Sequence, residues 1–521
     1  MSSGKLLPER KQAAKDLLIG CSLVSLLYID VWRLLLSAAT PSNGFFLAYG
    51  PSDYLAAIAT VLTGGVLMAV LSPPLRRAPR AVQYVISLFF LATSIVVLNE
   101  LRKSNEGRLP AVLGVWNELR QAVGIPILAI LGLVVLAVTL RHTIPITKWY
   151  RRVLLTVSLF AVFAMVRGTW ILATMNFDAF HTVTRHPHPG LPSAHRVVMV
   201  VFDEMDNEMA FTRRPKDLSL PNFDALRTTS VTFDSTYSPG PNTMESMSSY
   251  LLGRRVDSLI PLSANSFVAL LKNGRRVLSD TATSIFSGPA ARGARTALVG
   301  FALPYCRLRL TGMVDHCEQI PLVGGGMVDV QREGFWRAVA QQTQSLLPFN
   351  MRRSHIAGLR EAIENAADLA ADSSYALVLL HLPLPHSPWV WDRRTNQFRV
   401  TILGDDGYLG NLALADRVLG RMRDEMIRRG IWDATTLIVT ADHPWRAKLN
   451  QGRSTDRRIP LMIKLPGMKE GEHIETPTNS IVVSSLVPAL IDAQIPNAAA
   501  LRIRVAQITA SDSTFQLKHT P

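Results

Sequence analysis

The chain has 521 residues, which is long enough for more than one domain. Hydrophobic residues make up 48% of it and its mean hydropathy is +0.18, which argues against a wholly soluble protein and predicts a membrane part. A formal net charge of +15 is also compatible with nucleic-acid binding. The basic residues flank apolar stretches, however, so we expect attraction to anionic lipid and no nucleic-acid partner.

Five apolar stretches in the N-terminal third are each close to the ~20 residues that a helix needs to cross a bilayer. They are residues 17–39, 56–72, 81–98, 123–140 and 153–173. No small-residue cleavage site follows the first stretch, so we expect it to be a span and not a signal peptide. The sequence therefore predicts a transmembrane domain over residues 1–175.

The charges of the loops predict the orientation of these spans, because cytoplasmic loops are rich in Lys and Arg. The basic residues of the N-terminus and of the second–third and fourth–fifth loops are Lys5, Arg10, Lys11, Lys15, Arg76, Arg77, Arg80, Arg141, Lys148, Arg151 and Arg152. The first–second loop has neither Lys nor Arg, and the third–fourth loop is mixed in sign. We therefore expect the N-terminus inside and, after five spans, the C-terminal part outside.

Two features of this half have alternative interpretations. Asp30 and Arg33 share one helix face, either as a charge pair near the end of a tilted span or as a contact for a lipid headgroup. The Pro- and His-rich stretch around residues 176–194 is either a linker or a metal-capturing segment, and its composition favours a linker.

The C-terminal part, residues 195–521, alternates strand-like and helix-like stretches, which predicts an α/β domain with a largely parallel sheet. The first strand, Arg196–Glu204, is apolar and ends in Asp203 and Glu204. A later one, Thr435–His443, is also apolar and ends in Asp442 and His443. Ligands bind at the carboxyl ends of parallel strands, so these four side chains predict a metal site. The further expected elements are residues 223–228, 335–346, 356–371, 410–429 and 485–493 as helices and 231–237, 295–300, 375–382 and 459–464 as strands.

The stretch Tyr237–Arg254 lies in the sequence between the strands that end in Glu204 and His443. Turn residues ending in Asn242 precede Thr243, and a run without Pro or Gly follows, so Thr243 stands at the start of a helix. Free N–H groups and the helix dipole favour an anion there. Thr243 is then either a nucleophile beside an anion site or only the N-cap of the helix.

Cys306 and Cys317 are close in sequence within the expected exported part. Disulfides are stable in oxidising compartments, so we expect these two to be bonded; the alternative is two thiols. Cys21 lies in an apolar run and is expected to be inert.

Together the three stretches resemble the alkaline phosphatase/sulfatase superfamily, in the same order and over about residues 195–495. Sulfatases carry a Cys, converted to formylglycine, shortly before an L-x-G-R turn; Thr243 stands at that position before Leu252-Gly253-Arg254. Ser246 keeps the Ser of the sulfatase motif, and Met247 replaces its Arg. A Thr is similar to the nucleophile of the membrane-bound transferases of this superfamily, the phosphoethanolamine transferases and lipoteichoic acid synthases.

The resemblance implies a five-span enzyme of the bacterial inner membrane with its catalytic domain on the periplasmic or extracellular side. A membrane phospholipid would donate a phosphoethanolamine or phosphoglycerol group to Thr243, and an envelope glycan or lipid would accept it. The alternatives are a sulfatase-like hydrolase of phosphate or sulfate esters and a catalytically dead membrane scaffold.

The expected metal ligands are Glu204, Asp442 and His443, followed by Asp203. Their mixed oxygen and nitrogen donors suit Zn²⁺ or Mn²⁺ and do not exclude Mg²⁺ or Ca²⁺. The transferases also carry an H-x-x-x-x-H-x-P stretch, which is matched here by His381, His386 and Pro388. The resemblance thus implies substrate binding by His386 and His381. With them we group Asn242 and Arg446, while Lys448, Arg457 and Arg458 are expected mostly to face solvent.

Overall fold

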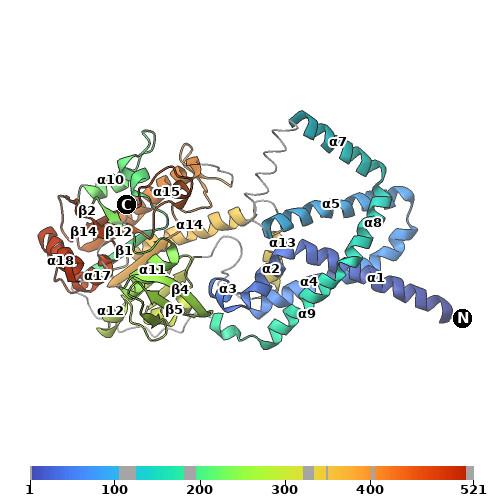
Figure 1. Cartoon of the computed structure of the whole chain (residues 1–521), viewed down its shortest axis with the longest axis horizontal. Coiled ribbons are helices and arrows are strands. Elements are labelled where there is room, and N and C mark those ends of the chain that lie inside the picture. Colours follow the sequence, from blue (N-terminus) through green and yellow to red (C-terminus); the bar gives the residue numbers. More distant parts are fainter. Residues whose placement is uncertain are drawn as a thin grey trace. The chain divides into compact units, whose positions relative to one another are not determined.

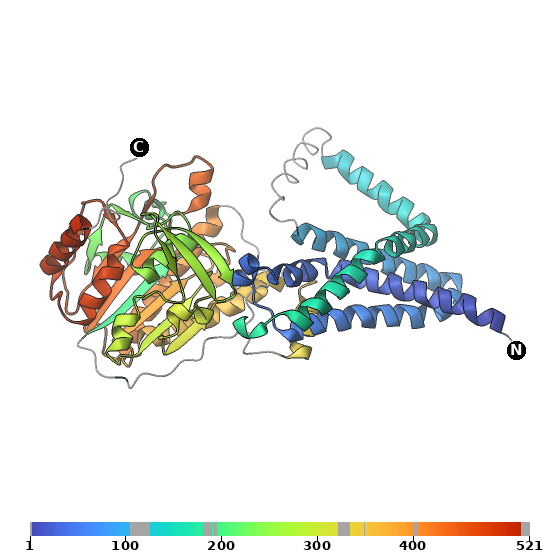
Figure 2. The same cartoon turned by 60° about the horizontal axis from the view of Figure 1, so that its bottom comes forward.

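The computed structural model describes residues 3–104, 125–180, 190, 195–320, 334–347, 350–400 and 405–511. These residues form two compact units. The first consists of helices from the N-terminal third, and the second is an α/β unit built around a large sheet (Figures 1 and 2).

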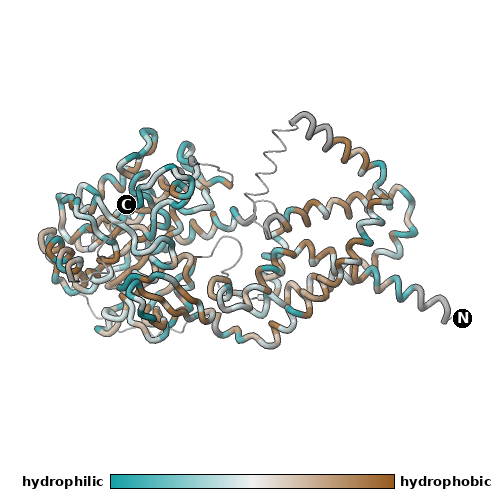
Figure 3. Tube along the Cα trace, viewed as in Figure 1, coloured by the Kyte–Doolittle hydropathy of each residue, from teal (hydrophilic) through white to brown (hydrophobic). Residues whose placement is uncertain are grey.

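The N-terminal unit contains the apolar helices, which are brown for much of their length in Figure 3. Its helices are α1 (Ser3–Leu27), α2 (Ile29–Ala38), α4 (Pro51–Arg77), α5 (Arg80–Ser104), α7 (Ile125–Arg141), α8 (Thr143–Thr156) and α9 (Ser158–Thr174). Among the described residues, three helical stretches are long and apolar enough to cross a membrane: Pro51–Arg77, Arg80–Leu101 and Thr143–Thr174. A fourth is a bent pair, Glu9–Leu27 with Ile29–Ala38.

The first expected span is therefore not one straight helix, since α1 and α2 meet at an angle of 74°. Asp30 and Arg33 lie on α2 just after this bend and form an ion pair with an N–O distance of 2.7 Å. The side chains of the expected fourth span lie partly outside the described residues. Five spans thus stay a prediction.

Small residues bring α1 and α4 close together. A Cβ on Gly20 would lie 2.5 Å from the carbonyl oxygen of Gly64, and one on Gly65 would lie 2.4 Å from Sγ of Cys21. Helices of apolar bundles approach closely where both carry such residues. Beyond this contact, the buried carboxylate of Asp16 forms ion pairs with Arg76 and Arg151. Arg76, in the last turn of α4, and Arg151 of α8 therefore meet the N-terminal helix at the same carboxylate.

The second unit is an α/β domain with an eight-stranded mixed sheet, in the order β15-β2-β14-β12-β1-β9-β7-β8. The strands are β1 (Arg196–Phe202), β2 (Val231–Phe233), β7 (Thr296–Gly300), β8 (His316–Gln319), β9 (Leu377–Leu382), β12 (Thr435–Ala441), β14 (Leu461–Lys464) and β15 (Glu472–Ile474). The pairs on both sides of β1 are parallel, whereas β14 runs antiparallel to β12 and β2. The α/β class expected from the sequence is confirmed, and the sheet is mixed.

Helices cover both faces of this sheet because its central strands are apolar on both sides. One core holds residues from α10 (Pro221–Arg227), α14 (Asn350–Ala370) and α15 (Asp405–Arg428), and the other holds residues from α11 (Thr243–Leu252), α17 (Val482–Ile491) and α18 (Ala498–Ser511). All seven residues of β1 and of β12 are buried. Such near-continuous apolar strands are typical of sheets with both faces covered.

A smaller antiparallel sheet, β4 (Val256–Ser263), β5 (Ser266–Leu271) and β6 (Arg276–Leu278), follows α11. No strand was expected over these residues from the sequence. The expected strand 231–237 is also divided, into β2 and the two-residue β3 (Thr236–Tyr237), which belongs to another small sheet.

Two helices each belong to the other unit from the one that surrounds them in the sequence. Helix α3 (Pro41–Phe46), between α2 and α4, is part of the α/β unit. Phe45 is fully buried there, and Arg307 donates hydrogen bonds to the carbonyls of Gly44 and Phe45. Conversely, α13 (Phe335–Gln344) is part of the helical unit, where Nε2 of Gln342 donates to the carbonyl of Asp53 on α4 at 2.8 Å.

Candidate functional site

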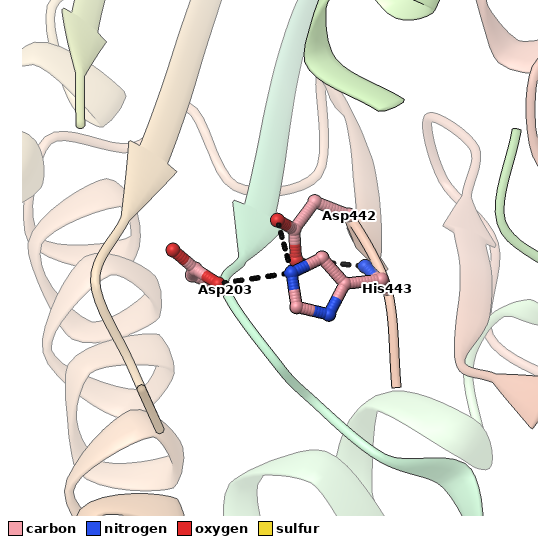
Figure 4. Close-up of side chains that lie close together, drawn as sticks. All are labelled: Asp203, Asp442 and His443. Atoms are coloured by element: carbon pink, nitrogen blue, oxygen red, sulfur yellow. Dashed lines mark hydrogen bonds and ion pairs between the residues drawn. The ribbon is translucent and has the colours of Figure 1, made fainter. Parts of the chain in front are cut away.

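The site lies at the carboxyl ends of β1 and β12, which are neighbours in the sheet. Their register pairs Phe202 with Ala441, so the residues that follow, Asp203 and Asp442, emerge side by side. His443 comes directly after Asp442. The two carboxylates and the imidazole point toward one another (Figure 4), and one ligand atom from each lies within 4.8 Å of the others.

The hydrogen bonds of Asp442 leave one of its oxygens directed into this cluster. Oδ1 accepts the backbone N–H groups of Glu204 at 3.0 Å and His443 at 2.7 Å. Oδ2 is buried, has no hydrogen-bond partner within the described residues, and lies 3.3 Å from Nε2 of His443. The backbone thus fixes the carboxylate and leaves a lone pair for a ligand.

The imidazole of His443 is fixed in the same way. Nδ1 lies 2.9 Å from the carbonyl oxygen of Pro444, which can only accept, so Nδ1 carries the proton. Nε2 then presents a lone pair toward Asp203 at 3.7 Å and Asp442 at 3.3 Å. A hydrogen bond at the other ring nitrogen is the usual arrangement of a metal-binding His.

Asp203 supplies the clearest sign that a cation belongs here. The residue is 1% exposed, and within the described part of the chain neither carboxylate oxygen has a hydrogen-bond partner. Burial, followed by the negative charges of Asp442 and Glu204, raises the pKa of Asp203 well above its usual range. Unpartnered buried carboxylates are costly. A divalent cation would satisfy both of them, so the donor set fits the expected metal.

Thr243 is the first residue of α11, and its hydroxyl reaches this cluster. Oγ1 lies 3.2 Å from Nε2 of His443. The N-cap position is held by Asn242, with φ −137° and ψ 165°, and not by Thr243. The hydroxyl therefore faces the metal-type ligands, which distinguishes it from a capping group.

The turn before α11 explains this placement. Oγ of Ser246 donates to the carbonyl of Gly240 and accepts its N–H, which folds the turn back onto the first helical turn. A Cβ on Gly240 would lie 2.5 Å from Cβ of Glu245, so a larger residue cannot occupy this position without displacing the helix. The turn thus fixes the position of Thr243 at the helix start.

Glu204 carries an ion pair of its own beside this cluster. Its φ is +65°, and its carboxylate accepts from Nε of Arg446 at 2.9 Å. The three-residue cluster contains Asp203 and not Glu204. The expected role of Glu204 as a metal ligand stays a prediction.

Arg446 connects the remaining expected substrate-binding residues. Its side chain is 38% exposed and lies 3.4 Å from Oδ1 of Asn242 and 3.5 Å from Nε2 of His386. Burial lowers the pKa of His386, so a neutral ring accepts from the guanidinium. The positive charge of Arg446 lies beside the N-terminus of α11, where it can contact an anion.

His381 lies deeper than this group. It is fully buried within β9, and its Nδ1 is 3.0 Å from the hydroxyl of Tyr305. Burial lowers its pKa to about 4. Its Nε2 has no partner among the described residues. The expected role of His381 in substrate binding stays a prediction.

Lys448 is an exception to the expectation that most of the basic residues after His443 face solvent. It is 3% exposed and forms 2.7 Å ion pairs with Asp206 and Glu208. Oδ2 of Asp206 also accepts from the backbone of Trp445 at 3.3 Å. This buried charge cluster connects the loop after β1 to the loop after β12. The acidic residues at 206 and 208 were the available signal for it.

Cys306 and Cys317, the pair expected to be bonded, form a disulfide with a Cα–Cα distance of 5.6 Å. The bond joins the segment after β7 to β8 at one edge of the large sheet.

No family model and no curated protein matches the chain. Solved structures that match it include a protein of the alkaline phosphatase superfamily from Vibrio parahaemolyticus, with 16% identity over 61% of this chain and 72% of that one and a TM-score of 0.37. Another is the phosphonate monoester hydrolase of Silicibacter pomeroyi (15% identity, 57% and 73% covered, TM-score 0.39). A third is the lipoteichoic acid synthase LtaP of Listeria monocytogenes (14%, 58% and 73%, TM-score 0.36). The first of these three carries the name of the superfamily that the sequence motifs resemble.

Proposed function

We propose that the chain is a membrane-anchored, metal-dependent enzyme that transfers a phospho-headgroup from a phospholipid to an envelope glycan or lipid, with Thr243 as nucleophile. The apolar helices of the N-terminal unit supply the anchor. The observation that carries the proposal is the hydroxyl of Thr243, 3.2 Å from a histidine nitrogen whose lone pair also faces two buried carboxylates.

Asp203, Asp442 and His443 would hold the metal ion, with Glu204 as a further proposed ligand. A divalent cation bound there would lower the pKa of the Thr243 hydroxyl and draw charge from the oxygens of the substrate. Oxygen and nitrogen donors together suit Zn²⁺ or Mn²⁺, with Mg²⁺ and Ca²⁺ as weaker candidates.

In the first step, Oγ1 of Thr243 forms a bond to phosphorus and the bond from phosphorus to the lipid glycerol oxygen breaks. The proton of the Thr243 hydroxyl passes through solvent to the departing glycerol oxygen, so that a diacylglycerol results. In the second step, the oxygen of an acceptor hydroxyl forms a bond to phosphorus, the bond from phosphorus to Oγ1 breaks, and the acceptor's proton passes to Thr243. Arg446 is placed to pair with a phosphate oxygen, and N–H groups at the start of α11 are placed to donate to another.

The proposed donor is a phosphoethanolamine or phosphoglycerol lipid. The proposed location is the bacterial inner membrane, with the α/β unit on the periplasmic or extracellular side. The disulfide supports this side, because disulfides persist in oxidising compartments. Epitope tags near Arg77 and after Asp512 test the location, because only the second should be reached from outside in intact cells whose outer barrier has been permeabilised.

The nucleophile is tested by incubating the purified chain with phospholipid and no acceptor. The peptide that contains Thr243 should gain the mass of the headgroup, and Thr243→Ala should abolish this adduct while the metal content stays unchanged. Thr478→Ala is the matched control, because Thr478 is also buried and its hydroxyl binds only a backbone carbonyl, 2.9 Å away.

The fate of the adduct separates the alternatives. A transferase holds it until an acceptor arrives, a hydrolase loses it to water, and a dead scaffold never forms it. Undiminished turnover by Thr243→Ala would refute the assignment.

A further inference from the structure

The three-stranded sheet β4–β5–β6 carries exposed apolar side chains on one face. Ile260 of β4 pairs with Val268 of β5, which pairs with Leu278 of β6, so these three side chains form one row across the sheet. Ile260 is 47% exposed and Leu278 is 38% exposed. Leu262, two residues after Ile260, is 49% exposed. Adjacent strands lie about 4.8 Å apart, so the row extends over about 10 Å.

The side chains on the opposite face of the same sheet pack into the core of the α/β unit. Phe267, Ala269 and Leu271 of β5 are all buried there. The antiparallel sheet therefore has a second apolar face that its own domain does not cover, in contrast to the usual arrangement of a polar outer face. Exposed apolar surface of this kind marks an interaction site.

The position of α3 indicates what this face meets. The ring of Phe45 on α3 lies 5.9 Å from that of Phe267, which pairs with Pro261 beside Ile260. Helix α3 begins three residues after the end of α2 and ends five residues before the start of α4. These apolar helices thus continue directly into α3, which packs against the buried face of the same sheet. If they cross the bilayer, α3 holds this small sheet close to the bilayer surface.

The charge of the same segment is that of a surface for anionic lipid. Residues 254–279 contain five basic residues and one acidic residue: Arg254, Arg255, Lys272, Arg275, Arg276 and Asp257. The turn between β5 and β6 is exposed over 272–276. Basic residues beside apolar ones bind anionic membranes through both electrostatic attraction and burial of apolar area.

We propose that this face of the β4–β5–β6 sheet docks on the bilayer that anchors the chain, with Ile260, Leu262 and Leu278 entering the interfacial region and the basic turn contacting anionic headgroups. Docking would present the site of the α/β unit to lipids of the same membrane. This inference rests on the membrane anchoring of the proposed function.

The test measures the depth of single probes in the full chain, reconstituted into vesicles that contain phosphatidylglycerol. A cysteine that carries an environment-sensitive fluorophore replaces Ile260, and lipids brominated on their acyl chains serve as quenchers. Native cysteines do not interfere, since Cys21 is buried and the other two are bonded. Intact Cys306–Cys317 bonding in each variant shows that the domain is folded.

Two matched positions make the result interpretable. Ile427 on α15 is 48% exposed, close to the 47% of Ile260, and a probe there should keep its fluorescence. Phe89 on α5 is 80% exposed within an apolar helix, and a probe there should be quenched. Strong quenching at 260 and 89 with none at 427 is the expected result.

Each other outcome decides a specific point. Quenching at 89 but not at 260 overturns the docking and leaves the membrane anchor intact, whereas loss of quenching at 89 overturns the anchor itself. If the labelled Ile260→Cys protein is not quenched, and the unlabelled variant forms disulfide-linked dimers efficiently, this face contacts a second copy of the chain and not the bilayer.

The charge component has its own test. Arg276→Glu should reduce quenching at position 260, whereas Arg394→Glu, at a side chain that is 84% exposed, should not. Equal quenching with and without phosphatidylglycerol would overturn the assignment of anionic headgroups as the occupant.

Discussion

We expect the buried cluster around Lys448 to stabilise the loops that carry the site, and a substitution of Lys448 tests this. Lys448→Met would remove the cation that Asp206 and Glu208 share while retaining most of the side-chain volume. Asp206 is fully buried, and its Oδ1 and Oδ2 lie 2.8 and 2.7 Å from Nζ of Lys448. Removing one partner of a buried ion pair leaves an uncompensated charge, which costs about 3–5 kcal/mol.

Hydrogen exchange of the β1 amides measures this cost, because central strands exchange through the largest openings of a domain. A loss of 3–5 kcal/mol corresponds to exchange that is roughly 150- to 5,000-fold faster. Lys469→Met is the control: its pair with Asp433 is 3.5 Å long and exposed, at 76% and 67%, so its removal should cost at most about 1 kcal/mol. If the two variants exchanged at equal rates, the buried cluster would have no special role in stability.

Three further predictions concern the site, the disulfide and one buried lysine. Asp203→Asn should abolish metal binding in isothermal titration, whereas Glu204→Gln should weaken it less, because Glu204 also pairs with Arg446; the opposite ranking would contradict a ligand set centred on Asp203, Asp442 and His443. Cys317→Ser should lower the unfolding free energy by about 3 kcal/mol, since the bond closes a loop with a sequence separation of 11, and non-reducing peptide mapping should find the bonded pair in the wild type. Burial lowers the pKa of Lys464 from 10.5 to about 8. The unfolded chain therefore holds the Lys464 proton more tightly than the folded chain, and the free energy of unfolding should rise between about pH 8 and 10.5. Lys464→Met should lack this rise, and equal pH profiles of the two proteins would disprove the prediction.

Much of the α/β unit could be predicted from local pattern. The apolar runs that became β1, β9 and β12 are recognisable because both faces of the sheet are covered. The short strands were missed for the opposite reason. In β4 the apolar residues at 259, 260 and 262 do not alternate regularly, and the pairing with β5 contains register shifts that only the tertiary structure reveals.

The candidate site was partly predictable for a similar reason. Asp203, Asp442 and His443, predicted from strand ends, and Thr243, predicted from a helix start, lie close together in the structure. The ion pair of Glu204 with Arg446 and the burial of Lys448 both depend on partners more than 200 residues away in sequence. Neither is visible in a local pattern.

The exchange of α3 and α13 between the two units affects how the protein can be divided for experiments. A fragment that begins after the apolar helices lacks Phe45, and so it exposes the side chains that this ring covers. It also retains α13 without the helical surface that binds Gln342. We expect such a fragment to be poorly soluble and prone to aggregate. A better one would omit residues 334–347 and receive the 41–48 segment as an added peptide.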